Sequence, residues 1–493
     1  MKHYNLLVNH FKKIAKFNHL AAICHWDQAA VMPSGGNDAR SEAMAELSVH
    51  IHGLLTQPQL SDWLNEAQSE VKTSDEMAAL REMKRSWYSA NLLPESLVEA
   101  KSIAGSKCEH AWRQQRKDNN WDGFVSNWQE VVTLSREEAA IRADATGTSP
   151  YDAMVDIYEP GMKSETLDVV FSNLKTWLPS LVDEVIEKQK QQALITPAEH
   201  YSTQAQKALG LEVMKLLQFD FDHGRLDESI HPFCGGVPQD VRITTRYNEH
   251  EFVQSLMGIV HETGHARYEQ GLLSQYAGLP VGEARSMGIH ESQSLFFEMQ
   301  VGRSAPFIEH LSQLTQKHFP ALDQAQFSQT NLLNLYTRVE KGFIRVDADE
   351  LTYPAHVMLR YEIERDLING AIKPTDVPEL WDHKMQSYLG LSTAGNYRDG
   401  CIQDIHWTDG AFGYFPSYTL GAMYAAQFMM AMRNTVDVDC AIRSGDLTPI
   451  FNWLSTNIWQ KGSVLTTDEL VSQATGQTLN PEFFQKHLRA RYL

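Results

Sequence analysis

Hydrophobic residues recur with the spacing of an α-helix from the beginning of the chain. Leu7, Phe11 and Ile14 fall on one helical face, and the Met-Pro-Ser-Gly-Gly segment at 32–36 interrupts this pattern. Segments rich in Ala, Glu and Lys predict further helices at residues 38–54, 62–90, 95–117 and 121–144. Pro179 predicts the first turn of another helix. The pattern therefore predicts a mainly α-helical protein.

One segment alternates with the period of a β-strand. In residues 240–247 (DVRITTRY), Val241, Ile243 and Thr245 point to the same side. A Gly- and Pro-containing loop at 232–238 precedes this segment, and a long helix is predicted over residues 251–270. We therefore expect a small β-sheet near the middle of the chain. The polar stretch 188–206 is the least periodic part and is a candidate hinge or boundary.

Composition narrows the class of protein. The 493 residues are 43% hydrophobic and 21% charged, which is ordinary for a globular protein with a large core. The net charge of −19 disfavours nucleic acid and anionic membranes as partners, because both are negatively charged. Since no stretch of 18 apolar residues occurs, no membrane span is expected. Five widely spaced cysteines without a CxxC pair predict reduced thiols and a cytoplasmic location.

The candidate chemistry lies in the helix predicted at 251–270. It contains the pentapeptide His-Glu-Thr-Gly-His, in which His261 and His265 project from the same face one turn apart. Both imidazoles can then reach one Zn²⁺ at about 2.0–2.1 Å. Glu262 stands where it can accept a proton from water on that metal. Two histidines on a helix also occur by chance, but the preceding apolar run predicts a buried site, where such side chains need a partner.

A third metal ligand has to come from outside this helix. The metzincin pattern requires a glycine at 268 and a histidine at 271, whereas the sequence has Tyr268 and Gly271. Glu291 opens a helical stretch after a loop and is the predicted third ligand. Glu283 and Glu298 are the alternatives, and Glu298 fits a structural role better.

The residues after Glu291 do not supply the usual second carboxylate. Many zinc peptidases carry an acid one turn after this glutamate, which orients a ligand histidine. Ser294 and Leu295 occupy these positions here. The orienting group must therefore come from elsewhere. His231 and His290 are expected to support the ligands rather than to bind the metal, since a zinc site with one open position takes three protein ligands.

Six motifs occur in a fixed order along the chain. They are HPF at 231–233, DxRxT at 240–244, HExxH at 261–265, HESQ at 290–293, IRxxAD at 344–349 and GxxQ at 400–403. In this order they resemble the Taq-type, or thermostable, metallocarboxypeptidase family. The segments HWD at 25–27 and YEPG at 158–161 are also similar to that family, so the resemblance covers the whole chain.

The resemblance implies both a fold and an activity. The implied fold is mainly α, a single domain over residues 1–493 with two helical halves around a deep groove beside a small sheet, similar to neurolysin and angiotensin-converting enzyme. The catalytic motifs would lie within residues 231–427. The implied protein is a homodimer with one Zn²⁺ per chain, which Co²⁺ can replace, and it removes single residues from the free C-termini of peptides.

A carboxypeptidase must hold the free carboxylate of its substrate. The guanidinium fork of arginine suits that geometry better than lysine does. Arg345 lies in a family motif and is favoured, with Arg242 and Arg360 as alternatives. The competing interpretation of Arg345 is a structural ion pair with one of the acids at 347, 349 and 350.

A donor is also needed opposite the metal to stabilise the tetrahedral intermediate. Similarity to the converting-enzyme group implies His406 and Tyr414 for this role, with Tyr418 in reserve, and Gln403 is a further candidate for substrate binding. The alternative for each aromatic residue is a packed core side chain. The strand at 240–247 is expected to lie at the groove edge and to pair with the substrate backbone, which would make side-chain preference broad.

Two other functions compete with a carboxypeptidase. An oligoendopeptidase or dipeptidyl carboxypeptidase on the same scaffold would lack the pocket for a single terminal residue. A metal-stabilised binding protein without activity is disfavoured because binding alone needs no general base at Glu262.

Overall fold

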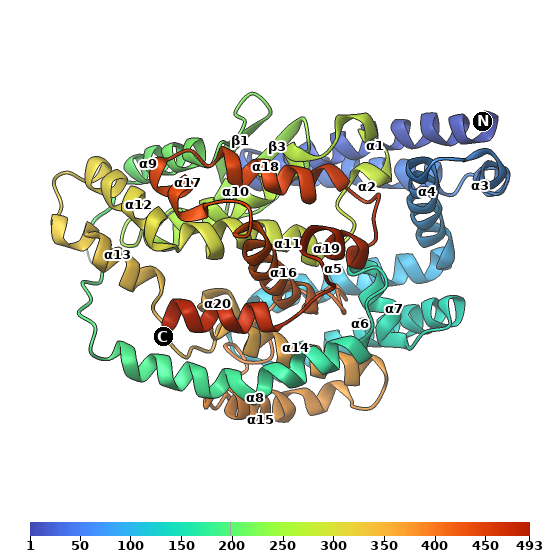
Figure 1. The fold of residues 1–493 in the computed structure, drawn as a ribbon. Coiled ribbons are helices and arrows are strands. Elements are labelled where there is room, and N and C mark those ends of the chain that lie inside the picture. The colour runs from blue at the N-terminus through green and yellow to red at the C-terminus, as the bar shows by residue number, and fades with distance from the viewer. Residues whose placement is uncertain (198) are drawn as a thin grey trace.

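A computed structural model describes residues 1–197 and 199–493, and its chain is mostly helical (Figure 1). The α-helices are α1 (Lys2–Ala30), α2 (Asn37–Leu55), α3 (Gln59–Glu70), α4 (Ser74–Leu92), α5 (Glu95–Lys117), α6 (Trp121–Thr146), α7 (Pro150–Tyr158), α8 (Ser164–Gln189), α9 (Thr203–Leu216), α10 (Val253–Gly271), α11 (Met287–Leu295), α12 (Ala305–His318), α13 (Gln329–Tyr336), α14 (Tyr353–Ile368), α15 (Val377–Leu389), α16 (Pro416–Met432), α17 (Val438–Ser444), α18 (Thr448–Asn457), α19 (Thr467–Thr475) and α20 (Glu482–Tyr492). A π-helix, η4 (Phe296–Gly302), continues α11. The prediction of a mainly α fold is confirmed.

The small sheet lies near the middle of the chain and has three strands: β1 (Gly224–Glu228), β2 (Cys234–Val237) and β3 (Asp240–Thr245). Their order is β1-β3-β2, with β1 parallel and β2 antiparallel to β3. Val241 and Ile243 of β3 are fully buried, as the alternation predicts. However, β3 is the central strand and both of its edges are paired. The prediction that this strand pairs with substrate is therefore wrong, because a free edge exists only on β1 and β2.

The first helix agrees with its predicted pattern. Leu7, Phe11 and Ile14 are buried, and α1 ends just before the Met-Pro-Ser-Gly-Gly segment. The single helix expected over 62–90 is instead two helices, α3 and α4. Thr73 caps the second of them, because its side chain accepts from the Glu76 backbone N–H while the Glu76 carboxylate accepts from the Thr73 N–H.

The proline assigned to a helix start lies inside a longer helix. Pro179 is within α8, which begins fifteen residues earlier at Ser164. Apolar side chains before and after it are buried on one face of α8, among them Leu174, Leu178 and Leu181. Their packing outweighs the loss of one backbone hydrogen bond at the proline.

The polar stretch 188–206 contains the connection between α8 and α9. The last residues of α8 and the first turn of α9 lie at its two ends, and residue 198 is outside the described residues. The structure therefore places a loop here. It gives no separate folding unit on either side, since α8 and α9 both contribute to the same main core.

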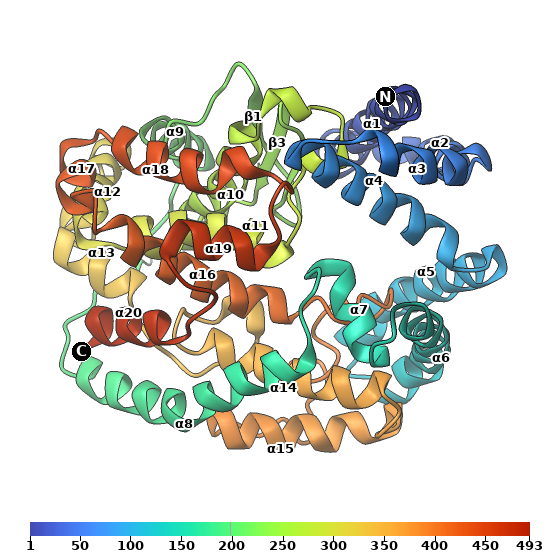
Figure 2. The same cartoon turned by 45° about the vertical axis from the view of Figure 1, so that its right-hand side comes forward.

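Two apolar cores organise the molecule. The main core joins α5–α16 and the C-terminal helices, with α10, α11 and α16 near its centre (Figures 1 and 2). A second, smaller core lies among α1, α3 and α4, which project at one side of the molecule in both views. Leu279 and Val281, in the segment after α10, pack into this second core and connect it to the rest.

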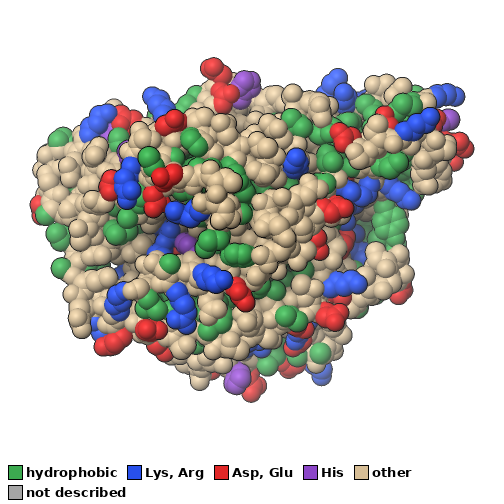
Figure 3. Space-filling model, in the orientation of Figure 1, with side chains coloured by type: hydrophobic (Ala, Val, Ile, Leu, Met, Phe, Trp, Pro, Cys, Tyr) green, Lys and Arg blue, Asp and Glu red, His purple; other side chains and the backbone are tan. Residues whose placement is uncertain are grey.

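The surface and the cysteines add few constraints. On the face drawn in Figure 3, acidic and basic side chains are interspersed. None of the five cysteines is in a disulfide. Among the described helices, none is both long enough and apolar enough to cross a membrane.

Candidate active site

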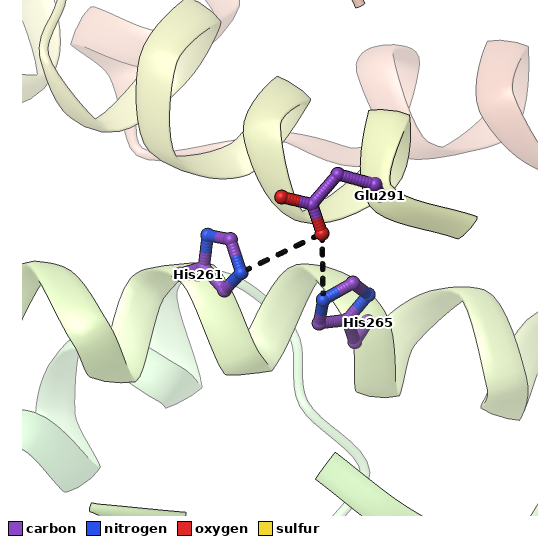
Figure 4. Close-up of side chains that lie close together, drawn as sticks. All are labelled: His261, His265 and Glu291. Atoms are coloured by element: carbon purple, nitrogen blue, oxygen red, sulfur yellow. Dashed lines mark ion pairs between the residues drawn. The ribbon is translucent and has the colours of Figure 1, made fainter. Parts of the chain in front are cut away.

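Three candidate metal ligands converge between two helices. His261 and His265 project from α10, and Glu291 reaches toward both of them from α11 (Figure 4). Glu291 Oε2 lies 3.4 Å from His265 Nε2 and 3.9 Å from His261 Nε2. Within the described residues, these three side chains are the group whose ligand atoms all lie within 4.8 Å of one another.

The geometry of this group fits a tetrahedral metal. Ligand atoms placed about 2.0–2.1 Å from a Zn²⁺ are about 3.4 Å apart along a tetrahedral edge, close to the separations found here. The donor set of two imidazoles and a carboxylate also suits Zn²⁺ or a similar divalent ion. The carboxylate is well prepared for this role. Burial raises the pKa of Glu291, but the hydrogen bond from His265 and the two imidazole charges outweigh that effect and lower it to about 2.

Glycines set the spacing of the helices that carry the ligands. A Cβ added at Gly264 of α10 would lie 2.6 Å from the backbone oxygen of Gln293 in α11. A Cβ added at Gly421 of α16 would lie 2.7 Å from Cγ of Glu291. The absence of side chains at these two positions lets α10, α11 and α16 approach closely enough to fix the direction of Glu291.

A carboxylate outside the ligand group orients one of the histidines. Glu298 Oε2 lies 2.8 Å from His261 Nδ1, which leaves His261 Nε2 to face Glu291. Arg303 in turn donates to the other oxygen of Glu298 at 2.6 Å. Such a carboxylate–histidine pair fixes the tautomer and the ring orientation of a metal ligand. Glu298 thus provides the orienting carboxylate that the sequence after Glu291 lacks.

The second histidine is held differently. His265 Nδ1 is buried without a hydrogen-bond partner among the described residues. The ring of His290 stacks on the His265 ring with centroids 4.5 Å apart, and His290 Nε2 lies 2.9 Å from a carboxylate oxygen of Glu269. Burial lowers the pKa of His265 to about 4, so the ring is neutral and available as a ligand at neutral pH.

Glu262 lies beside the ligand group but is not part of it. Its side chain is 9% exposed, and burial raises its pKa to about 7, with the charge of His261 opposing this shift. A carboxyl group with a pKa near neutrality can both accept and return a proton. The nearby thiol of Cys234 feels the charge of Glu262, which places the first residue of β2 next to this carboxylate.

The candidate oxyanion donors lie in a second cluster, on the loop before α16 and the first turn of that helix. His406 Nε2 is 3.1 Å from the hydroxyl of Tyr418, and the Tyr414 ring lies 5.6 Å from the His406 ring. Burial and the charge of Arg345 lower the pKa of His406 to about 4, so its ring is neutral. The charge of Glu291 raises the pKa of both tyrosines, in addition to the effect of burial, so this cluster faces the ligand group.

Arg345 is held in this second cluster by two bonds. Its Nε donates to Asp404 at 2.9 Å and its Nη1 donates to the Tyr353 hydroxyl at 2.6 Å. Its guanidinium lies 4.9 Å from the Tyr418 ring. The third nitrogen, Nη2, has no hydrogen-bond partner within the part of the chain that the structure describes. The bond to Asp404 was not anticipated, since the acids at 347, 349 and 350 were the expected partners.

The other two candidate arginines have fewer free donors. Arg360 is completely buried and binds Asp404 through Nε at 2.7 Å, and its guanidinium lies 4.5 Å from the Trp381 ring. Arg242 donates to both oxygens of Asp240, and its guanidinium lies 4.4 Å from the ring of Trp26. Both guanidinium groups are therefore engaged by the protein itself.

Three further predicted residues lie away from the ligand group. The Gln403 side chain accepts from the backbone N–H of Arg345 at 2.8 Å and donates to backbone carbonyls, which indicates a role in shaping the loop. Glu283 is exposed, and its carboxylate is not in the ligand group. His231 is exposed, and its ring has no hydrogen bond among residues 1–197 and 199–493.

Two residues of the site were not assigned from sequence. Glu298 follows Glu291 by seven residues, which is two helical turns and therefore the same face, so its position carried a usable signal. Asp404 follows Gln403 directly in the sequence, but its partner Arg345 is 59 residues away. No local spacing connects them.

Comparison with known proteins agrees with this geometry. The family model described as "Carboxypeptidase Taq (M32) metallopeptidase" matches residues 6–492. Thermostable carboxypeptidase 1 of Thermus thermophilus is 35% identical, with 99% of this chain and 98% of the relative aligned. Carboxypeptidase 1 of Bacillus subtilis is 34% identical, with 98% and 96% aligned.

A solved structure is also similar over its full length. Metallocarboxypeptidase 1 of Trypanosoma cruzi has a TM-score of 0.98 and 48% identity, and the alignment covers 100% of this chain and 99% of that chain. The resemblance seen in the six motifs thus extends to the whole fold. The chain belongs to the carboxypeptidase Taq (M32) family of metallopeptidases.

Proposed function

We propose that this metallocarboxypeptidase uses one Zn²⁺ per chain to release single residues from the free C-termini of peptides. The observation that carries the proposal is the convergence of His261, His265 and Glu291, with Glu262 next to the first histidine. A divalent ion held by these side chains supplies Lewis acidity, which activates water and polarises the peptide carbonyl. Co²⁺ is expected to replace Zn²⁺, because it accepts the same ligands.

Glu262 is the proposed general base and proton shuttle. Its carboxylate takes a proton from the attacking water and delivers it to the nitrogen of the leaving residue. The pKa near 7 supports this role, because both transfers then require little free energy at neutral pH. Glu298 holds His261 in the orientation that a ligand needs.

His406 and Tyr414 are the proposed donors to the oxyanion of the tetrahedral intermediate, with Tyr418 in reserve. Support comes from the neutral state of the His406 ring and from the influence of Glu291 on both tyrosines. A neutral imidazole and a phenol each carry one polar hydrogen that can point at developing negative charge.

Arg345 is the proposed anchor for the substrate carboxylate. Asp404 and Tyr353 fix its orientation and leave Nη2 to donate. Two buried arginines also share the one carboxylate of Asp404, so this cluster carries an excess positive charge that an incoming carboxylate would neutralise. Arg360 then contributes charge without contact, while Gln403 and Arg242 hold the loop and the sheet.

The peptide is proposed to lie in a groove between two helical halves of the single domain 1–493. Glu283 supports a hollow near the site, since the residue is exposed to solvent while burial raises its pKa to about 7. This combination is expected of a side chain on the wall of a cleft. The edge of β2 is the proposed partner of the substrate backbone, because Cys234 begins this strand beside Glu262.

Two broader features belong to the same proposal. A homodimer is supported by the family resemblance and is checked by the molar mass in solution. A cytoplasmic location is supported by the five cysteines, none of which is in a disulfide.

One assay separates this activity from its alternatives. Peptides with a free or an amidated C-terminus are incubated with the enzyme, with and without a chelator, and the products are followed by mass spectrometry. We expect a ladder of single-residue losses from the free peptide only, abolished by chelation and restored by Zn²⁺. Internal cleavage of both peptides would contradict the exopeptidase proposal and favour an oligoendopeptidase. Release of residue pairs would favour a dipeptidyl carboxypeptidase.

A further inference from the structure

A buried glutamate on α14 contacts both ends of the loop that carries the proposed oxyanion donors. Glu364 has no exposed surface. Its Oε1 accepts from the indole Nε1 of Trp407 at 2.6 Å, and its Oε2 accepts from the backbone N–H of Gly413 at 3.0 Å. Trp407 directly follows His406, and Gly413 directly precedes Tyr414. One carboxylate therefore joins the neighbours of both candidate donors.

The same helix holds this loop at a third point. Arg360 lies one turn before Glu364 on α14 and binds Asp404, which precedes His406 by two residues. This ion pair fixes where the loop begins. It does not set the distance from His406 to Tyr414, because every residue between them lies beyond Asp404. Only Glu364 contacts both the His406 end and the Tyr414 end.

The Tyr414 end of the loop has little freedom to adjust. Gly413 has a φ of 93°, and a Cβ at this position would lie 2.8 Å from the backbone of Met154 and Val155 in α7. The ring of Tyr158, also in α7, packs edge-on against Tyr414 at 5.0 Å. The Gly413 N–H is thus pressed against α7 and directed at Glu364, so its bond fixes the backbone just before Tyr414.

Keeping a carboxylate at this position is costly. Burial raises the pKa of Glu364 to about 7, although Trp407, Gly413 and Tyr151 all donate to it. An apolar side chain often replaces a buried charge without loss of stability. A residue with only a packing role would therefore not need two acceptor oxygens directed at two parts of one loop.

We propose that Glu364 is a positioning residue for the hydrolytic reaction, whose carboxylate sets the separation and direction of His406 and Tyr414. The inference rests on the proposed roles of these two residues. Donors that act on the oxyanion stabilise the transition state and not the bound substrate, so their displacement lowers kcat and leaves KM nearly unchanged.

The main test is Glu364→Gln. Glutamine has the same shape but only one acceptor oxygen, so it cannot accept from both Trp407 and Gly413. We expect kcat to fall at least tenfold, KM to change less than threefold, and the metal content to stay at that of the wild type. A phosphinic peptide, which mimics the tetrahedral intermediate, should bind at least tenfold more weakly.

Glu362→Gln is the matched control. Glu362 lies on the same helix, is similarly buried, and binds Lys384 and Tyr388 at 2.5 and 2.8 Å without contacting the loop. This variant should lose comparable thermal stability and keep its kcat. Tyr151→Phe removes the donor to Glu364 that lies outside the loop, and kcat should stay within twofold of the wild type.

Trp407→Phe tests the same contact from the other side. It removes the indole donor, should lower kcat at least fivefold, and should add little to Glu364→Gln in the double variant. If Glu364→Gln does not fold, this variant decides alone, and an unchanged kcat overturns the proposal. A kcat within threefold of the wild type in Glu364→Gln, or an equal loss in Glu362→Gln, also overturns it.

Failure of the underlying roles has a separate signature. His406→Ala and Tyr414→Phe should each lower kcat if these residues are the donors. If neither does, the proposed oxyanion donors are wrong. If both do while Glu364→Gln keeps kcat, the donors stand and Glu364 has no positioning role.

Discussion

Glu262 and Glu291 are close together, yet their pKa values move in opposite directions. Burial raises the pKa of Glu262 to about 7, because no cationic partner binds it. Glu291 is also buried, but bonding to His265 and the charges of two imidazoles lower its pKa to about 2. The environments thus separate a proton-transferring acid from a permanently charged ligand.

The first prediction concerns Glu262→Gln. The amide has nearly the same shape but cannot take up a proton, so turnover should fall at least 100-fold. The three ligand side chains are unchanged, so the metal content measured by elemental analysis should remain that of the wild type. A variant with a tenth of the normal activity would show that another group acts as the base.

The second prediction concerns Arg345→Ala. Losing one side of a buried charged contact costs about 2–5 kcal/mol, so kcat/KM for a peptide with a free C-terminus should fall about 30-fold or more. A slowly cleaved amidated peptide, which lacks the charge, should be affected much less. The comparison of the two substrates distinguishes the loss of a contact from distortion of the site. Equal losses would mean that Arg345 only supports the structure around Asp404.

At the scale of helices, the site depends on how closely α10, α11 and α16 approach one another. The π-helix η4 continues α11 and carries Glu298 to His261, while Gly264 and Gly421 leave room for the neighbouring backbones. π-helical segments are rare and occur often at functional sites. The ligand geometry is therefore a property of three packed helices and not of the HExxH sequence alone.

The third prediction tests this packing with Gly421→Ala. The new methyl group would lie 2.7 Å from Cγ of Glu291, so the carboxylate has to move. We expect metal affinity, measured by competition with a chromophoric chelator, to fall about tenfold or more. The control is Gly258→Ala on α10, where an added Cβ meets no atom within 4 Å. Affinity should be unchanged in that variant, and an equal loss in both would exclude the steric explanation.

Some elements could be predicted from sequence because their signals are local. The pattern of Leu7, Phe11 and Ile14 predicts α1, and the alternation of Val241 and Ile243 predicts β3. The neighbouring strands β1 and β2 were missed, since both are short and β2 contains two glycines. The order that makes β3 central depends on pairing between distant segments, which no local pattern encodes.

The site shows the same division. The spacing of His261 and His265 predicts that they share a helical face, and the structure places Glu291 beside them. The contacts of Arg345 with Asp404 and of Glu364 with Trp407 join residues more than 40 positions apart. Such contacts follow from the packing of α14 against the loop, so sequence spacing could not reveal them.

The whole molecule has two apolar cores, and the ligand helices belong to only one of them. Leu60 and Leu64 of α3 pack in the N-terminal core, whereas α10 and α11 lie in the main core. A metal bound by His261, His265 and Glu291 links two helices of the main core. Anything that binds only the folded state stabilises it, by about 4 kcal/mol at a concentration 1,000-fold above Kd.

The fourth prediction follows from this separation. Removing the metal should lower the thermal midpoint and accelerate amide hydrogen exchange in α10 and α11. Exchange in α3 and α4 should change little, because their core is separate from the ligand helices. Hydrogen exchange with mass spectrometry, with and without chelator, checks this expectation. Equal acceleration in both regions would show that the two cores unfold together.

The N-terminal helices meet the rest of the molecule through two unlike contacts. Toward the segment after α10, Leu279 and Val281 make an apolar junction. Toward the sheet, the junction is polar: Arg242 lies over the Trp26 ring at 4.4 Å, and His19 Nε2 lies 3.3 Å from Asp240. Ions in solution screen the polar junction, while strongly hydrated salts reinforce the apolar one. Ionic strength should therefore loosen these helices on the sheet side alone, so the salt content of the buffer can regulate access from that side without any change in sequence.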